Sequence, residues 1–494
     1  MLGPLSNLYR GGKALLGGSV FVVSLLTLLV PTQVCAQPGP AAEHDFWGSQ
    51  AVQPDTLAPG HQTYWGPLPA RSDSVSAIFR ERPRPSWETV AMVPYWVVGL
   101  PFRAAFLVAD QSVKGMDELG FFGGHAEYPG IPVPGGAYLM PSVAFDGLEG
   151  LTLGVHATKH HFLGRDNMLF LRANRSSSKS GAYAGGTLFH LTDSWHLETG
   201  GGFESRNQAR YYGLGPDSRN GNLSYYYRSV SWGGLALNRD LAPDLQLGTR
   251  VYFSQVQARQ PHINRDEALE LVHPTDLPPG YPGQSNGWTV RLGLDRNNTN
   301  QKGRPREGGY QAVGVSLFRA TDGSDLSYLT WHANLEKYFK LWHTDRTLAV
   351  RGFANRLTAA GSDPIPFSRL VTFQRPDELR GFHSLRFYGM GSLGLSLEYR
   401  WPVWVARDRN DMGLDAYLFS DSGQVFNHTH EISLTNFHWT AGGGARVVSS
   451  SRKTAMRLEI GLSDETTVLR LTFSQTFQYN PKGFLYGKNP TKIY

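Results

Sequence analysis

The side chains in this sequence that could act as acids or bases lie at alternate positions of apolar segments. One residue separates Glu398 from Arg400, and one separates Arg457 from Glu459. A carboxylate in such a pair can act as a general acid or base when its surroundings shift its pKa. Here the charges alternate with large apolar residues, and on the inner face of a β-barrel such charges normally pair with and hydrate one another. We therefore interpret Glu398, Arg400, Arg457, Glu459 and Arg470 as structural charges of a barrel lumen.

Two further patterns could carry chemistry, and neither is convincing. The segment His428-Thr429-His430-Glu431 offers two imidazoles, but a His-x-His in a loop is more often solvated than metal-bound. A serine hydrolase needs Gly-x-Ser-x-Gly, and the nearest match, Met390-Gly391-Ser392-Leu393-Gly394, lacks the first glycine and begins a strand. We predict no catalytic, cofactor-binding or metal site, and we expect that the protein is not an enzyme.

The elements that carry these charges are predicted to be long strands. From Gly136 onward apolar and polar residues alternate with a period of two, which indicates strands with two different faces. A soluble sandwich also alternates, but its strands usually have about five or six residues. The segments here run to about ten residues, the length that a tilted strand needs to cross a bilayer. Because backbone groups in lipid must all be paired, such strands must close into a barrel.

The fold class predicted is all-β, a 16-stranded antiparallel transmembrane β-barrel preceded by a short helical segment. The predicted strands are 136–146, 151–161, 167–175, 181–191, 195–206, 222–238, 245–256, 287–295, 308–319, 326–340, 346–358, 391–402, 411–421, 435–448, 454–462 and 466–477. The long connections, 207–221, 257–286 and 359–390, all follow odd-numbered strands. If the first strand starts in the periplasm, every long loop lies outside the cell, as in bacterial outer-membrane barrels.

One arginine and one aspartate stand out within this arrangement. The loop before the twelfth strand contains Leu379-Arg380-Gly381-Phe382, and the thirteenth strand ends with Phe419-Ser420-Asp421-Ser422-Gly423. By alternation Asp421 lies on the polar, lumen side of its strand. A long loop could fold back into the lumen, where Gly381 would allow a tight backbone and Arg380 could pair bidentately with Asp421.

On these motifs the sequence resembles the outer-membrane assembly-factor superfamily, which includes the two-partner-secretion transporters and the bacterial surface antigen proteins. The resemblance implies a barrel whose sixth outside loop folds inward with a (V/I/L)RG(F/Y) tip, which an FxDxG motif on strand thirteen receives. Lesser likenesses are Tyr211-Tyr212-Gly213-Leu214-Gly215 after strand five, and Asp295-Arg296-Asn297-Asn298 with Gly303-Arg304-Pro305 between strands eight and nine. The residues that the resemblance implies for a structural lock are Arg380, Gly381, Phe382, Phe419, Asp421 and Gly423.

The likeness covers about 136–477, and the chain departs from the family on both sides of it. Members that insert or export proteins carry polypeptide-transport-associated domains before the barrel, whereas 37–135 is too rich in proline to hold a convincing one. The family barrel usually ends the chain, whereas a tail, 478–494, follows here.

The composition fits an exported protein. One cysteine among 494 residues excludes a disulfide scaffold, and a mean hydropathy of −0.32 with 12% aromatic residues excludes a helical membrane protein and a disordered chain. Residues 1–36 are predicted to be a secretory signal peptide, with basic Arg10 and Lys13, an apolar stretch from Ala14 to Val30, and cleavage after Ala36. A membrane anchor and lipidation at Cys35 are the alternatives. Cleavage removes two of the 47 basic residues, which leaves 45 against 41 acidic ones, too small an excess to suggest nucleic-acid binding.

Two segments separate the predicted signal peptide from the barrel. Residues 37–86 are predicted to be a Pro/Gly-rich periplasmic linker, and residues 87–120 an apolar, helical segment. An inner-interface helix, a plug in the lumen and a membrane span all remain open for the second segment.

The resemblance implies a role in outer-membrane biogenesis or in translocation of protein or lipid, in the outer membrane of a Gram-negative bacterium. The expected partners are outer-membrane lipids and lipopolysaccharide, an envelope protein or lipid cargo, and the cell's barrel-insertion machinery. A passive or substrate-selective pore is the alternative, and a surface lipid-modifying enzyme a remote one.

Overall fold

A computed structural model describes residues 62–63, 66–67, 131–146, 150–164, 167–300, 304–341, 346–373, 378–405, 412–449 and 456–472. The predicted signal peptide, helical segment and tail lie outside the described residues. The predicted linker does so too, apart from a two-residue ladder between β1 (Gln62–Thr63) and β2 (Gly66–Pro67). No helix in the described ranges has the length and apolar character needed to span a membrane.

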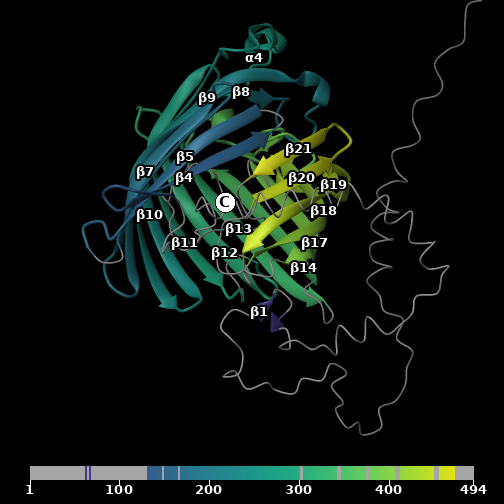
Figure 1. The fold of residues 1–494 in the computed structure, drawn as a ribbon. Helices are drawn as coiled ribbons and strands as arrows, with labels where there is room; N and C mark the ends of the chain where they lie inside the picture. The colour runs from purple at the N-terminus through teal and green to yellow at the C-terminus, as the bar shows by residue number, and fades with distance from the viewer. Residues whose placement is uncertain are drawn as a thin grey trace, which may run out of the picture. The chain divides into compact units, whose positions relative to one another are not determined.

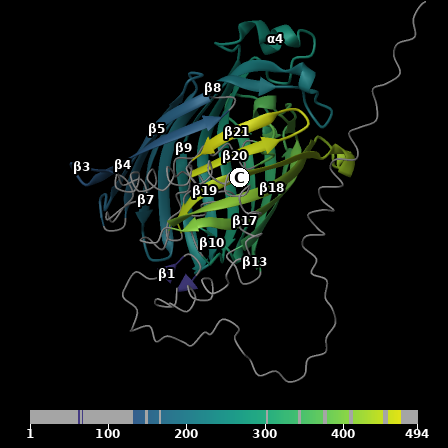
Figure 2. The ribbon, with the colours of Figure 1, turned by 45° about the vertical axis from the view of Figure 1, so that its right-hand side comes forward.

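The described part of the chain forms a closed antiparallel barrel of sixteen long strands, as predicted (Figures 1 and 2). The strands are β4 (Ala137–Asp146), β5 (Gly150–His160), β6 (Met168–Ser176), β7 (Gly181–His190), β8 (Trp195–Tyr211), β9 (Ser224–Ala242), β10 (Leu245–Arg259), β11 (Gly283–Asn297), β12 (Gly308–Ala320), β13 (Ser327–Leu341), β14 (Arg346–Ala359), β17 (Gly391–Val405), β18 (Met412–Phe426), β19 (His438–Ser449), β20 (Met456–Leu462) and β21 (Thr467–Thr472).

Four strand ends extend four or five residues beyond the sequence prediction: the last residues of β8, β9 and β18, and the first residue of β11. β8 continues to Tyr211, which had been placed in the loop, and β11 begins at Gly283, four residues early. These strands extend because their backbones stay paired beyond the part of the sequence that alternates. Ala209 and Tyr211 pair with residues of β9, and Gly283 pairs with a residue of β10. Sequence alternation alone does not report such extensions, since side chains near the barrel ends face neither lipid nor a simple lumen.

The two faces of the barrel wall differ sharply in chemistry. On the outside, Trp331, Leu335 and Leu458 are about half exposed, at 54%, 54% and 49%. The inward-facing neighbours Asn334, Glu336 and Glu459 are 1–2% exposed. Apolar side chains outside and buried polar ones inside are the pattern that a lipid-facing barrel requires.

The long connections all lie at one end of the barrel. They join β8 to β9, β10 to β11, and β14 to β17, and we call this end the loop end and the opposite one the turn end. These three connections contain the short elements η2 (Asn220–Asn222), η3 (Arg265–Glu267), α4 (Leu269–Val272), η4 (Phe367–Arg369), β15 (Val371–Thr372) and β16 (Tyr388–Gly389). The β18–β19 connection at the same end contains η5 (Thr429–Glu431) and η6 (Leu434–Asn436). β15 and β16 pair with each other inside the β14–β17 connection.

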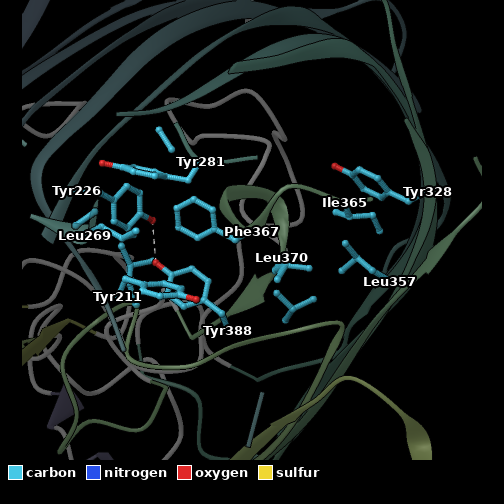
Figure 3. Packing of buried hydrophobic residues seen from close by; sticks show 14 of the residues in the cluster. Tyr211, Tyr226, Leu269, Tyr281, Tyr328, Leu357, Ile365, Phe367, Leu370 and Tyr388 are labelled. Carbon is cyan, nitrogen blue, oxygen red and sulfur yellow. Dashed lines mark hydrogen bonds between the residues drawn. The ribbon is translucent and has the colours of Figure 1, made fainter. Parts of the chain in front are cut away.

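An aromatic cluster ties these connections to the wall at the loop end. Phe367 is fully buried and makes edge contacts with Tyr211, Tyr226 and Tyr281 (Figure 3). The hydroxyl groups of Tyr226 and Tyr388 lie 2.9 Å apart and share a hydrogen bond. Burying several large rings stabilises the loop arrangement by more than their area alone, because edge-to-face pairs add about 0.5–1.5 kcal/mol each.

The barrel closes at a seam between its first and last long strands. Within the described residues, β21 pairs with β4 only at Arg470↔Asp146 and Leu471↔Phe145. A short strand, β3 (Ile131–Val133), lies along the other end of the same β4 edge and pairs with residues 137–139.

Candidate functional site

The tip of the β14–β17 connection, Leu379–Phe382, contacts the lumen face of the barrel wall. The Arg380 guanidinium donates from Nη2 to Asp421 Oδ1 at 2.7 Å and from Nε to Oδ2 at 2.9 Å, and the Arg380 backbone N–H also donates to Oδ2 at 3.0 Å. Both residues are 1% exposed. A buried guanidinium that donates from two nitrogens to the two oxygens of one carboxylate forms the strongest class of protein ion pair.

A balanced set of charges surrounds this pair. Arg380 Nη1 lies 3.5 Å from Glu398 and 3.9 Å from Glu459. Each of these glutamates has a second arginine, with Arg400 3.3 Å from Glu398 and Arg457 3.6 Å from Glu459. The three carboxylates and three guanidinium groups sum to zero charge, so the cluster avoids the cost of a lone buried ion. Four of the five residues predicted from sequence as lumen charges therefore meet in one network.

The Phe419 ring supports the same arginine from its other side. The Arg380 Cζ atom lies 3.6 Å from the centre of this ring, a close cation–π contact. Thr440 Oγ1 donates to Asp421 Oδ2 at 3.2 Å. The position of Arg380 is thus fixed by β18 and β19 together.

The main chain of the tip lies directly against β20. A side chain added at Gly381 would place its Cβ 2.5 Å from the Leu462 carbonyl oxygen, and one at Gly461 would place it 2.4 Å from the Arg380 carbonyl oxygen. Ser463 Oγ donates to the Gly381 carbonyl at 2.9 Å. Sequence reasoning predicted a need for Gly381 but not for Gly461, which looked like an ordinary lumen residue.

Arg470 on β21, the remaining predicted lumen charge, holds the tip from the seam side. Its Nη1 donates to the carbonyl of Arg380 at 3.0 Å, and its Nη2 donates to the carbonyl of Phe382 at 2.8 Å. These two partners are main-chain oxygens of the connection. No sequence signal could have identified carbonyl groups as its targets.

Phe382 and Gly423 complete the residues that the family resemblance singled out. The Phe382 ring lies 5.2 Å from that of Phe387, within an apolar cluster that also contains Phe373 and Val425. A Cβ at Gly423 would lie 3.0 Å from the Phe373 ring, so the absence of a side chain there leaves room for this cluster.

A second ion pair fixes the same connection at the loop end. Arg386 donates to both carboxylate oxygens of Glu465, at 2.6 and 2.7 Å, and Glu465 belongs to the β20–β21 turn. Arg386 also donates to Ser218 in the β8–β9 connection, at 2.9 and 3.0 Å, and lies over the Tyr212 ring. One side chain thus joins three connections. Sequence reasoning missed it, since nothing local marks a pair 79 residues apart.

Another buried arginine enters from the turn end. Arg304, in the Gly-Arg-Pro segment that carried a lesser family likeness, donates to the Asp415 carboxylate at 2.5 and 2.9 Å. Arg446 on β19 donates to the same carboxylate at 3.0 Å. Asp415 and Asp421 lie on the same face of β18, so this strand receives one arginine from each end of the barrel.

The patterns weighed for metal and hydrolase chemistry lie elsewhere. His428 and His430 are exposed and their rings stack at 5.4 Å. Among the described residues no group of three or more metal-ligating side chains gathers. Ser392 faces the lumen, and its Oγ accepts a hydrogen bond from Asn355 Nδ2 at 3.0 Å.

Comparisons with known proteins agree with this architecture. A family model described as the Omp85 superfamily domain matches residues 161–478. BamA from Haemophilus ducreyi, solved without POTRA domains 1–3, is similar with a TM-score of 0.51 and 15% identity over 69% of this chain and 70% of that chain. CdiB from Escherichia coli matches with a TM-score of 0.46 and 14% identity over 71% of this chain and 64% of that chain. No curated protein sequence matches. At this identity the likeness to BamA shows a shared barrel fold.

Proposed function

The chain belongs to the Omp85 superfamily, and on that premise we propose that it is a non-enzymatic outer-membrane barrel that acts in envelope biogenesis or in translocation of protein or lipid. In this proposal the loop end faces the cell exterior and the turn end faces the periplasm, as in other bacterial barrels. The tip Leu379–Phe382 is a structural lock that keeps the lumen closed.

The buried pair between Arg380 and Asp421 is the observation that carries this proposal. Taking both charges out of water costs several kcal/mol per ion and is offset only by good geometry and further hydrogen bonds. Those conditions are met here by the two-pronged contact and by the balanced charges of Glu398 and Arg400. A passive pore keeps its lumen for water, whereas this connection is anchored into the wall by buried ion pairs, which favours a gated barrel.

The loop end supports the same conclusion. Arg386 links three connections, and the cluster around Phe367 packs them against the wall. Both features oppose free diffusion through the barrel.

The seam is the proposed route by which cargo meets the membrane. Only two residue pairs of the described chain join β21 to β4, and β3 covers part of the remaining edge. Ile131 and Pro132 in β3 are exposed, and proline has no N–H to donate to a ladder. Within the described residues this junction has fewer strand pairs than the junction of β20 with β21, and we propose that it is the part of the wall that opens.

We also propose the remaining organisation of the chain as the sequence suggests it. Residues 1–36 direct export and are cleaved at Ala36, residues 37–86 form a periplasmic linker, and residues 87–120 form an apolar helical segment before the barrel. Outer-membrane lipids, lipopolysaccharide and the cell's barrel-insertion machinery are the proposed partners in assembly.

Depletion of the protein tests the biogenesis role. The envelope of depleted cells is compared with that of wild-type cells by quantitative proteomics and lipid analysis. We expect a specific class of outer-membrane protein or lipid to fall. An unchanged envelope, together with slower uptake of small solutes, would instead support a passive pore.

Cross-linking tests the seam. Cleavage at Ala36 removes the only cysteine, so Phe145→Cys with Leu471→Cys introduces a unique disulfide across two directly opposed residues. Leu458→Cys with Leu471→Cys is the matched control, because it joins the same strand to β20 instead. We expect the first pair to abolish complementation of the depleted strain and the control pair to preserve it. Full complementation by the seam-locked protein would contradict the proposed route.

Single-channel recording in planar bilayers tests the lock directly. The wild-type barrel should conduct little, and Arg380→Ala should open it more often. A large, steady wild-type conductance would favour the pore.

A further inference from the structure

One residue of the last strand, Arg470, both binds the loop tip and takes part in closing the barrel. The backbone of Arg470 pairs with Asp146 of β4, and it is one of the two residues through which the described part of β21 contacts β4. On its other side Arg470 is opposite Glu459 of β20. Its side chain points inward and donates to the carbonyls of Arg380 and Phe382.

These contacts form a short chain from the lock to the seam. Asp421 on β18 fixes Arg380, the Arg380 and Phe382 carbonyls accept from Arg470, and the Arg470 backbone closes on Asp146. The side chains of Asp421, Arg380 and Arg470 are 1–2% exposed. If one of these hydrogen bonds is broken, water therefore cannot take the place of the missing partner.

β21 meets β4 through the same residue that binds the tip. β4 pairs with β5 along its whole length, from Ala137 to Asp146, whereas β21 pairs with it at only two positions in the described chain. The β20 ladder and the hydrogen bonds from Arg470 to the tip also hold this part of β21 in place.

We propose that Arg470 is a positioning residue that couples the loop tip to closure of the seam, so that release of the tip loosens β21 and opening of β21 loosens the tip. The coupling is reciprocal because both states share one set of hydrogen bonds. The inference deepens the proposed function and rests on it, since it describes how the proposed lock controls the proposed route.

Hydrogen exchange on the purified full-length barrel in detergent tests the coupling without any cargo. The readout is the exchange rate of peptides that cover β21, with β12 as an internal control on a distant part of the wall. Arg470→Met removes both donors while keeping an apolar side chain of similar length. Loss of hydrogen bonds to a charged donor should raise exchange in β21 by about tenfold or more, with no change in β12.

Three further variants make the result specific. Arg446→Met removes another buried lumen arginine, which binds Asp415 and does not touch the tip, and it should leave β21 exchange as in the wild type. Arg470→Lys keeps a charged donor and should give an intermediate rate. Arg380→Ala should raise β21 exchange as Arg470→Met does, and the double variant should add little because one chain of contacts is broken in both.

The outcomes separate the two proposals. Wild-type exchange of β21 in Arg470→Met, or an equal rise in β12, overturns the coupling. The same rise in Arg446→Met overturns it as well, because any lost lumen charge would then suffice. If Arg380→Ala opens the channel in bilayers while Arg470→Met leaves the seam unchanged, the coupling fails and the proposed lock stands.

Discussion

Removal of Arg380 is expected to destabilise the barrel by about 3–5 kcal/mol, the usual cost of leaving one partner of a buried ion pair alone. In Arg380→Ala, the carboxylates of Asp421, Glu398 and Glu459 outnumber the two remaining arginines, so the cluster carries one uncompensated negative charge. Asp421→Ala leaves one uncompensated positive charge instead. Its cost should fall at the lower end of the range, because Arg380 still faces Glu398 at 3.5 Å and Glu459 at 3.9 Å.

The double variant distinguishes a pair from two unrelated residues. With both side chains removed, the two remaining carboxylates face Arg400 and Arg457, and the cluster is neutral again. The double variant should therefore lose little more stability than Arg380→Ala alone. The coupling energy of the cycle is then about as large as the smaller single effect.

Equilibrium unfolding by denaturant in lipid vesicles measures the three free energies, and heat-modifiable electrophoresis gives an independent ranking. Arg380→Lys keeps the charge but not the two-pronged geometry, and it should recover only part of the loss. Asp421→Asn keeps the shape without the charge and should resemble Asp421→Ala. Losses that simply add in the double variant would refute the pairing as an energetic unit.

Three more outcomes are expected. Arg386→Ala should raise the exchange rate of the β8–β9 and β20–β21 connections together, because one side chain binds both, and a rise in only one of them would contradict this. Gly461→Ala should lower the free energy of unfolding by about 1–3 kcal/mol, because its Cβ would meet the backbone of the loop tip. Gly352→Ala, with open space around its Cβ, should lower it much less. Equal losses in the two variants would contradict the close approach at Gly461. A tag at Pro279 should be labelled on intact cells and one at Thr344 only after lysis, and the reverse pattern would invert the proposed orientation.

The sequence alone determined the strands and their faces. Alternation is a local property with a period of two, so Glu398, Arg400 and Asp421 could be placed on one face without knowledge of their neighbours. The length of the segments indicated strands that cross a membrane. Because backbone groups in lipid must all be paired, such strands must form a closed barrel. The parity of the long connections followed from counting. In the same way, the motifs around Arg380 and Asp421 suggested which two charges would meet.

Only the tertiary structure decided what else the connection touches. Glu465 as the partner of Arg386, the carbonyl targets of Arg470 and the close approach at Gly461 all depend on how the β14–β17 connection lies against the wall. Those contacts join residues up to 90 positions apart, and side-chain spacing along one strand carries no record of them. The pairing of β21 with β4, and the position of β3 beside it, likewise follow from closure of the whole barrel. The two strands that meet at the seam lie at opposite ends of the barrel sequence but are neighbours in space.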